Sequence, residues 1–344
     1  MKRVYPILIV AALFAVAPFV DVGIPFVFGT EIGSPGTLLV LGIALTFAAL
    51  AVSYDILFGY TGMLSLGHAL PFALGVYGTN LVMIHWGLPY FAASLVALVG
   101  GVLMALLLGS LALRTSGVAF AMVTLAFAEA FAILVLTDPL RIFGGEEGLP
   151  IAVDHLPDIF RGVVNTRYVY WLALLFAVAV FMLARLVVTS RAGRVWQAIR
   201  ENEPRVEMLG LRPFAFKLAS FVIASAIASA AGSVYLLLIR GANAGTTSAL
   251  FTLGILVMVV LGGTGKLWGA ALGGFIYGIL DLRLSEVATS DFIADMPTWL
   301  GGPLSEPLFI LGVLFVLLIL YFPGGLISIP GQLRKARSAR RVGQ

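Results

Sequence analysis

The sequence predicts an all-α protein, a polytopic helical bundle in the membrane with about ten transmembrane spans, some of them broken or re-entrant. Of its 344 residues, 60% are hydrophobic and only 11% are charged, and the mean hydropathy is +1.06. Ordinary soluble domains are far more polar than this. The chain contains no cysteine, which excludes disulfide scaffolds, cysteine-bound zinc and thiol catalysis.

A helix needs about 17 to 25 apolar residues to cross a bilayer, and we find ten candidate runs. They are residues 4–20, 38–58, 66–84, 88–111, 118–136, 168–188, 214–239, 248–261, 268–282 and 304–322. The eighth and ninth are short, so a re-entrant pair is an alternative there. The first run has the features of a secretory signal peptide, but Pro18 would stand where the mature chain begins, and we expect the run to be retained.

The basic residues predict the orientation, because Lys and Arg concentrate on the cytoplasmic side of membrane proteins. Ten spans with both termini inside put most of the 21 Lys and Arg residues in the cytoplasm. The net charge of +4 therefore follows from topology, and nothing suggests a nucleic-acid partner. We predict a transmembrane domain over 1–330, with a cytoplasmic segment at 190–213, and a basic cytoplasmic tail over 331–344.

The segment 58–77, FGYTGMLSLGHALPFALGVY, is expected to be partly unwound. Four glycines and Pro71 interrupt an otherwise apolar run. Broken membrane helices persist only where protein or a watery cavity satisfies the freed backbone groups. The segment should therefore face the interior of the bundle, either lining a pathway or packing tightly through its small residues.

Asp55 and Glu129 are the acids that we place inside the membrane, whereas Asp281 and Glu306, near the ends of their runs, are expected on the outer face. Intramembrane carboxylates are candidates for function. Asp55 stands near the end of its span, where it could reach the membrane interface. Glu129 lies deeper, in TLAFAEAFAILVL, where a hydrogen bond to a neighbouring helix would also explain it. His68 could titrate near neutral pH, although a structural hydrogen bond is the simpler interpretation.

The longest polar stretch between apolar runs, 190–217, predicts two short helices separated by a bend. Val195, Ala198 and Ile199 share one helical face, with Trp196 at its edge. Asn202 and Glu203 suit a helix start, and Gly210 suits a helix end. Such a segment would either dock another protein or lie on anionic lipid through its arginines.

The run 260–274, VLGGTGKLWGAALGG, superficially matches a phosphate-binding loop. That loop requires glycine where Val260 stands and serine or threonine where Leu267 stands. We therefore predict a glycine-rich hairpin that serves close helix packing. No zinc-protease, nucleophile-elbow or dinucleotide motif is present, and the three histidines are scattered.

Taken together, these segments resemble the LivM-type permease of branched-chain amino acid ABC transporters. The motifs are FGYTGMLSLGHALPF, TLAFAE followed by GGEEGL, RAGRVWQAIRENEPRVEMLGLRPFAFK, VMVVLGGTGKLWGAALGG and YFPGGL. The resemblance covers most of the chain in order. It implies a multi-pass subunit of a bacterial or archaeal plasma membrane that pairs with a LivH-type permease, two ATPases and an extracytoplasmic binding protein.

The resemblance also implies that 190–213 couples the permease to an ATPase. The implied coupling residues are Arg191, Gly193, Arg194, Trp196, Ala198, Ile199, Arg200, Glu201, Asn202, Glu203, Leu209 and Gly210. Residues expected along the translocation pathway are Gly59, Gly62, Ser65, Gly67, His68 and Glu129. The chain itself would catalyse nothing and bind no cofactor or metal, since ATP and Mg would bind to the partner ATPases.

Two alternatives stay open. Related permeases carry urea, short amides or aromatic acids, and this chain departs from the family pattern at Phe143 and Gly254. The other alternative is a self-sufficient secondary transporter, in which Glu129 or His68 would carry a coupling proton.

Overall fold

We describe a computed structural model of the chain, which covers residues 5–20, 31–288, 302–303, 305–321 and 324–328. The predicted basic tail, 331–344, lies outside the described residues.

The described residues form eleven labelled α-helices. They are α1 Tyr5–Ala15, α2 Pro35–Asp55, α3 Ala69–Trp86, α4 Tyr90–Ala112, α5 Val118–Thr137, α6 Thr166–Thr189, α7 Arg191–Met208, α8 Pro213–Ile239, α9 Ala249–Gly262, α10 Leu267–Ala288 and α13 Pro307–Tyr321. Two short strands, β1 Leu149–Pro150 and β2 Gly241–Ala242, pair antiparallel. Each of the ten predicted runs coincides with a helix, and α7 forms in the polar stretch.

The all-α class is confirmed, but the count of about ten spans is not. Six helices of the described chain are long and apolar enough to cross a membrane: Pro35–Thr61, Tyr90–Ala112, Val118–Thr137, Thr166–Thr189, Pro213–Ile239 and Leu267–Leu284. Ala249–Gly262 has only 14 residues, so it extends about 21 Å at 1.5 Å per residue. That is shorter than a hydrocarbon core of about 30 Å.

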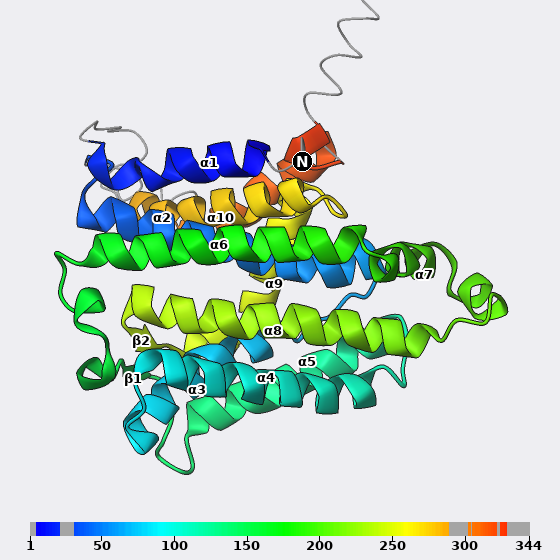
Figure 1. Cartoon of the computed structure of the whole chain (residues 1–344), viewed down its shortest axis with the longest axis horizontal. Coiled ribbons are helices and arrows are strands. Elements are labelled where there is room, and N and C mark those ends of the chain that lie inside the picture. The colour runs from blue at the N-terminus through cyan, green and yellow to red at the C-terminus, as the bar shows by residue number, and fades with distance from the viewer. Residues whose placement is uncertain (1–4, 21–30, 289–301, 304, 322–323, 329–344) are drawn as a thin grey trace, which may run out of the picture.

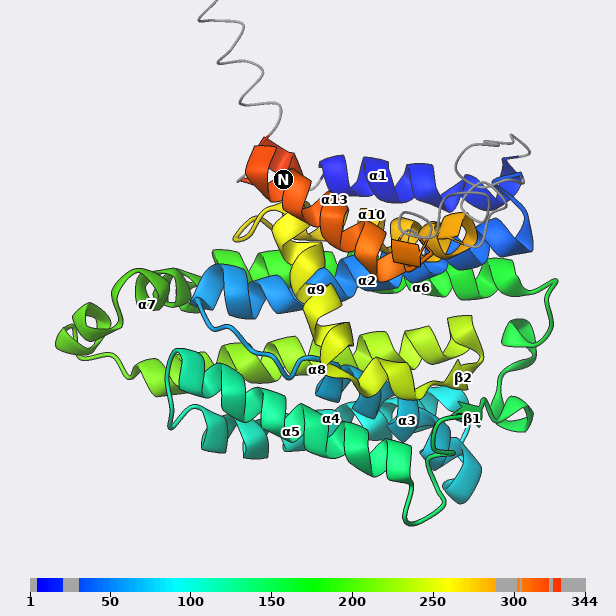
Figure 2. The ribbon, with the colours of Figure 1, turned by 180° about the vertical axis from the view of Figure 1, so that it is seen from behind.

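The long helices lie alongside one another, and the two ends of the bundle differ (Figures 1 and 2). At one end α7 projects beyond the other helices. At the opposite end lie β1 and β2, where Leu149 pairs with Ala242. The Arg240 side chain donates a hydrogen bond to the Gly162 carbonyl (2.8 Å), which ties the start of β2 to the loop before α6.

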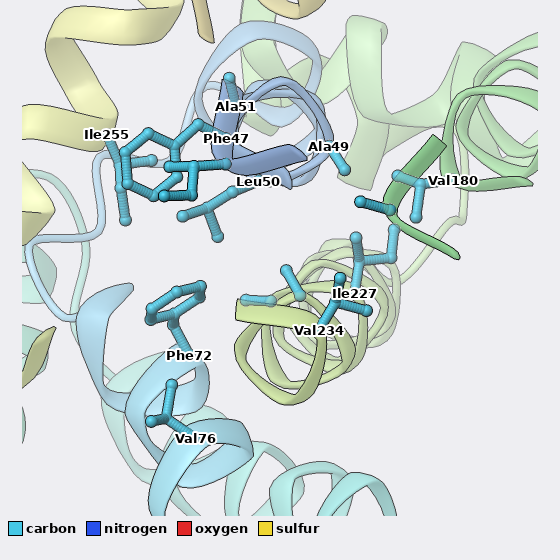
Figure 3. Packing of buried hydrophobic residues seen from close by; sticks show 14 of the residues in the cluster. Phe47, Ala49, Leu50, Ala51, Phe72, Val76, Val180, Ile227, Val234 and Ile255 are labelled. Atoms are coloured by element: carbon cyan, nitrogen blue, oxygen red, sulfur yellow. The ribbon is translucent and has the colours of Figure 1, made fainter. Parts of the chain in front are cut away.

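The helix α2 is the centre of the bundle, because it packs against α6, α8, α9 and α10. Figure 3 shows Phe47 and Leu50 of α2 near Ile255 of α9 and Phe72 of α3. All four side chains are buried. An apolar helix enclosed by others holds the remaining elements in register.

Small residues let the helices approach closely. A Cβ atom on Gly75 of α3 would overlap the Ser229 carbonyl of α8, and one on Gly232 would overlap the Phe72 carbonyl in return. Apolar side chains gain little by leaving lipid for another helix, so close van der Waals contact replaces the hydrophobic drive. These two glycines therefore fix how α3 crosses α8.

Candidate functional site

The break predicted after the second apolar run begins where α2 ends at Asp55. A π-helical segment, Ile56–Thr61, follows it. Gly62 then takes a left-handed conformation, with φ of 78°, which glycine adopts at little cost. The chain stays irregular until α3 begins at Ala69. The predicted unwinding is confirmed, and it comes before Pro71, which lies in the first turn of α3.

Neighbouring helices satisfy the backbone groups that this break frees. The Leu66 amide donates to the Thr124 hydroxyl of α5 (3.1 Å), and the Ala69 amide donates to the Thr252 hydroxyl of α9 (3.0 Å). The Tyr54 hydroxyl donates to the Ser65 carbonyl (2.9 Å). The segment thus faces the interior of the bundle, as predicted, and protein groups replace water around it.

The candidate pathway residues of this segment are enclosed by their own chain. His68 is buried, with Nε2 2.9 Å from the Ser53 hydroxyl and its ring edge-on to Tyr54. Ser65 is buried as well, and a Cβ on Gly67 would overlap the Thr124 carbonyl. In this conformation these residues serve packing and hydrogen bonding.

Glu129 connects two helices. Its Oε1 accepts a hydrogen bond from the Ala249 amide (3.1 Å), at the first residue of α9. Ser248 caps the same helix by accepting from the Phe251 amide. A carboxylate at a helix N-terminus is stabilised by the unpaired amides and the helix dipole. Glu129 therefore holds α9 against α5. The hydrogen bonds described for Glu129 and for His68 have no partner in common.

The predicted bend in the polar stretch is confirmed. Asn202 leaves the helical region inside α7, with φ of −161° and ψ of 96°, which divides α7 into two helices. Its Oδ1 accepts from the Arg205 amide (3.0 Å), as a capping asparagine does. Gly210, with φ of 79°, follows the end of the second helix.

The apolar edge of α7 is turned toward its own chain. Trp196 is fully buried, and its indole nitrogen donates to the Phe216 carbonyl of α8 (2.8 Å). Ile199 is only 5% exposed, and a Cβ on Gly193 would overlap the Val188 carbonyl of α6. These residues anchor α7 and do not present an apolar surface to another protein.

Other side chains of α7 are available to a partner. The exposed members of the predicted coupling set are Arg191, Arg194, Ala198, Glu201, Asn202, Leu209 and Gly210. Arg200 is also exposed in part, but its guanidinium is bonded to the Gly59 carbonyl and is not offered to a partner. At the far tip Met208 is 81% exposed and Leu209 is 74% exposed. Glu203 is half-buried and forms an ion pair with Lys217 of α8, so this anchor also lies between α7 and α8.

The structure brings together four residues, Asp55, Gly59, Arg200 and Gly265, whose meeting the sequence analysis did not predict. Asp55, for which reaching the membrane interface was one of two interpretations, is fully buried. Its Oδ1 accepts from the Gly265 amide (2.8 Å), in the predicted hairpin between α9 and α10. The Arg200 side chain of α7 donates to the Gly59 carbonyl close by. No local pattern indicates this meeting, because the partners are far apart in sequence.

The glycine-rich hairpin serves close packing, as predicted. A Cβ on Gly262 would overlap the Gly269 carbonyl, and one on Gly273 would overlap the Met258 carbonyl. Within the described ranges, no three His, Asp or Glu side chains are grouped so that they could hold a metal ion.

The family model described as branched-chain amino acid transport system / permease component matches residues 36–321. The chain belongs to this family. The match extends from α2 to α13, so it includes the broken segment, Glu129 and α7. The chain is a LivM-type permease, a multi-pass membrane protein of a family of transport subunits.

Relatives support this assignment over most of the chain. It is 27% identical to the LivM permease protein of Escherichia coli K12 over 342 residues, covering 90% of this chain and 74% of that protein. It is also 27% identical to a probable LivM permease protein of Methanocaldococcus jannaschii, covering 80% and 89%. The E. coli LivH permease protein is 22% identical, covering 83% and 92%. No solved structure matches the chain.

Proposed function

We propose that this LivM-type permease is one of two membrane subunits of a binding-protein-dependent ABC importer for branched-chain amino acids. A LivH-type permease would pair with it, and two cytoplasmic ATPases would bind ATP and Mg. An extracytoplasmic binding protein would deliver the substrate. Both termini would lie in the cytoplasm of a bacterial or archaeal cell. The chain performs no ATP chemistry itself.

The projecting α7 is the observation that supports this proposal best. It leaves the bundle at one end (Figures 1 and 2), and Met208 and Leu209 are exposed at its tip. The Trp196 hydrogen bond and the Glu203–Lys217 ion pair brace it on α8. A braced helix with an exposed apolar tip is suited to transmit a push from a docked protein.

Transport then proceeds by alternating access between two conformations of the bundle. ATP would favour one conformation through α7, and the binding protein would act on the opposite end. Substrate would pass between the two permeases, with the broken segment and Glu129 facing the pathway in one of these conformations.

The first test is to purify the tagged chain from native membranes in mild detergent and identify the proteins that accompany it. Two P-loop ATPases and a second permease are expected. Their reproducible absence, with the chain intact and monodisperse, would contradict the ABC assembly and favour a secondary transporter.

The second test concerns the substrate. The purified complex is reconstituted in proteoliposomes with its binding protein, and ATP-dependent uptake of labelled leucine, urea, a short amide and an aromatic acid is compared. Uptake restricted to leucine and its branched relatives is expected. Preference for one of the other compounds would retain the importer and reassign its cargo.

A further inference from the structure

The side chain of Arg200 connects α7 to the broken segment. It donates a hydrogen bond to the Gly59 carbonyl, which belongs to the π-helical segment Ile56–Thr61. The other side-chain hydrogen bonds and ion pairs described for α7 stay within residues 189–217. Among the side-chain hydrogen bonds and ion pairs described for α7, that of Arg200 is therefore the one that reaches a distant part of the chain, 141 residues earlier.

The two partners meet at a crowded junction. Asp55 Oδ1 accepts from the Gly265 amide, and a Cβ on Gly59 would overlap both of these groups. A Cβ on Gly265 would lie 3.0 Å from the Arg200 guanidinium. The junction of Asp55, Gly59, Arg200 and Gly265 thus joins the end of α2, the broken segment, α7 and the α9–α10 turn. Only glycine fits at its two backbone positions.

One acceptor in this junction is unused. Asp55 Oδ2 is buried and has no hydrogen-bond partner among the protein atoms, whereas a buried carboxylate oxygen is normally paired. A guanidinium carries five N–H donors and binds carboxylates well. Arg200 and Asp55 both lie against Gly265, so this oxygen is a second acceptor for the guanidinium at the same junction.

Two arrangements of nearly the same groups are therefore available. In the present one Arg200 holds the Gly59 carbonyl and Asp55 keeps a free oxygen. In the other the guanidinium pairs with Asp55, and the π-helical segment loses its only described side-chain partner on α7. A link with two discrete positions is what converts a small shift at one site into a change at another.

We propose that Arg200 is the positioning residue through which movement of α7 reaches the broken segment, by exchange between the Gly59 carbonyl and the free oxygen of Asp55. This inference rests on the proposed ABC function and names the contact that its coupling uses. The glycine at 62 supports it, because a Cβ there would lie 2.9 Å from Cγ of Arg200, so the arginine stem lies flat on the broken segment.

The test uses the full complex in proteoliposomes, with ATP hydrolysis and leucine uptake measured in the same preparation. Arg200→Met keeps an unbranched stem of similar reach and removes every donor. We expect it to retain the ATPases and to hydrolyse ATP, while uptake per ATP falls about tenfold or more, as loss of a charge-assisted hydrogen bond would cause. Arg200→Lys keeps the positive charge and three donors but lacks the planar guanidinium, so it should recover part of this ratio.

Two matched variants make the result specific. Arg114→Met removes a positive charge from the exposed α4–α5 turn and should leave uptake per ATP at the wild-type value. Asp55→Asn keeps an acceptor for the Gly265 amide but removes the negative charge that would attract Arg200. It should lower uptake per ATP as Arg200→Met does.

The contrary results distinguish failure of the Arg200 positioning role from failure of the proposed importer function. Wild-type uptake per ATP in Arg200→Met would reject the positioning role and leave the importer intact. Loss of the ATPases from that variant, or a larger fall in its melting temperature than in Arg114→Met, would reject it in favour of a docking or structural role. A wild-type complex without ATP-dependent uptake would reject the proposed function itself.

Discussion

Glu129 lies where a side chain of α5 meets the first turn of α9. A lone carboxylate in a membrane protein has two explanations, a proton-carrying group or a cap for a helix end. The hydrogen bond from the Ala249 amide to Oε1 gives the second explanation a physical basis, since the free amides of a helix start are unsatisfied without an acceptor.

The two explanations predict different effects of substitutions at Glu129 on stability and transport. Glu129→Gln retains an oxygen acceptor for the Ala249 amide and loses the charge, which is worth about 0.3–1 kcal/mol at a helix terminus. Glu129→Leu leaves the amide unsatisfied, at a cost of about 1–3 kcal/mol. We expect melting temperatures in detergent to fall in the order wild type, Gln, Leu, with transport following stability. Transport abolished by Glu129→Gln at unchanged stability would instead indicate proton coupling.

Asp138 organises the loop that follows α5. Its carboxylate accepts hydrogen bonds from the amides of Ile142, Phe143 and Gly144 at 2.8 to 3.1 Å. The loop places Phe143 in the core, where its ring packs edge-on against Tyr77 and Phe131. Desolvation raises the pKa of Asp138, but these backbone donors outweigh it, so the pKa lies below its ordinary value.

A lowered pKa has a definite sign in the stability profile. The ionised carboxylate stabilises the folded chain above the pKa of the unfolded state, and this contribution disappears as pH falls through the lower, folded-state pKa. Asp138→Asn tolerates the left-handed conformation at this position but cannot accept all these bonds. The melting temperature of the variant should be lower than that of wild type at neutral pH.

The comparison across pH isolates this one carboxyl from all others. The difference between wild type and Asp138→Asn should be constant above the ordinary pKa of aspartate and shrink toward zero in acid. A difference that does not vary with pH would show that the charge of Asp138 contributes nothing to the loop.

At the scale of elements, local sequence patterns predicted where α7 bends and ends, but not which helices it contacts. The bend followed from Asn202 and Glu203, and the end followed from Gly210, because caps and turns depend on neighbouring residues. Periodicity also showed that Val195 and Ile199 share a face. It could not show that this face meets α6 and α8, since an apolar stripe is equally suited to its own chain and to a partner.

The buried and exposed apolar residues of α7 should therefore respond differently to a charge. Ile199→Asp places a carboxylate in a site that is 5% exposed in the wild type and should cost about 3 kcal/mol or more. Leu209→Asp adds the same group at a side chain that is 74% exposed. It should leave the melting temperature near that of wild type and remove the ATPases from the purified complex.

A control at the other end of the bundle completes this comparison. Val164 is 83% exposed, so Val164→Asp adds the same charge at similar exposure and should retain the ATPases. Retention of the ATPases by Leu209→Asp would show that the tip of α7 is not the docking surface.

At the scale of the whole molecule, apolar composition predicted where helices form but not how many cross the membrane. A short helix such as α9 is as apolar as a full span, because it is enclosed by α2, α3 and α10. Composition reports the surroundings of a segment, whereas crossing depends on its length and direction. The same limit hides the junction at Asp55, where three parts of the chain that are far apart in sequence meet.

Orientation is the remaining property of the whole chain, and the absence of cysteine makes it directly measurable. Gln197→Cys is exposed on α7, and Val164→Cys is exposed near the strands at the opposite end. In spheroplasts, a membrane-impermeant maleimide should label the cysteine at 164 at once and the cysteine at 197 only after the membrane is opened. Equal labelling after denaturation serves as the control. The reverse order would place α7 outside the cell, beyond the reach of cytoplasmic ATPases, and coupling through α7 would be impossible.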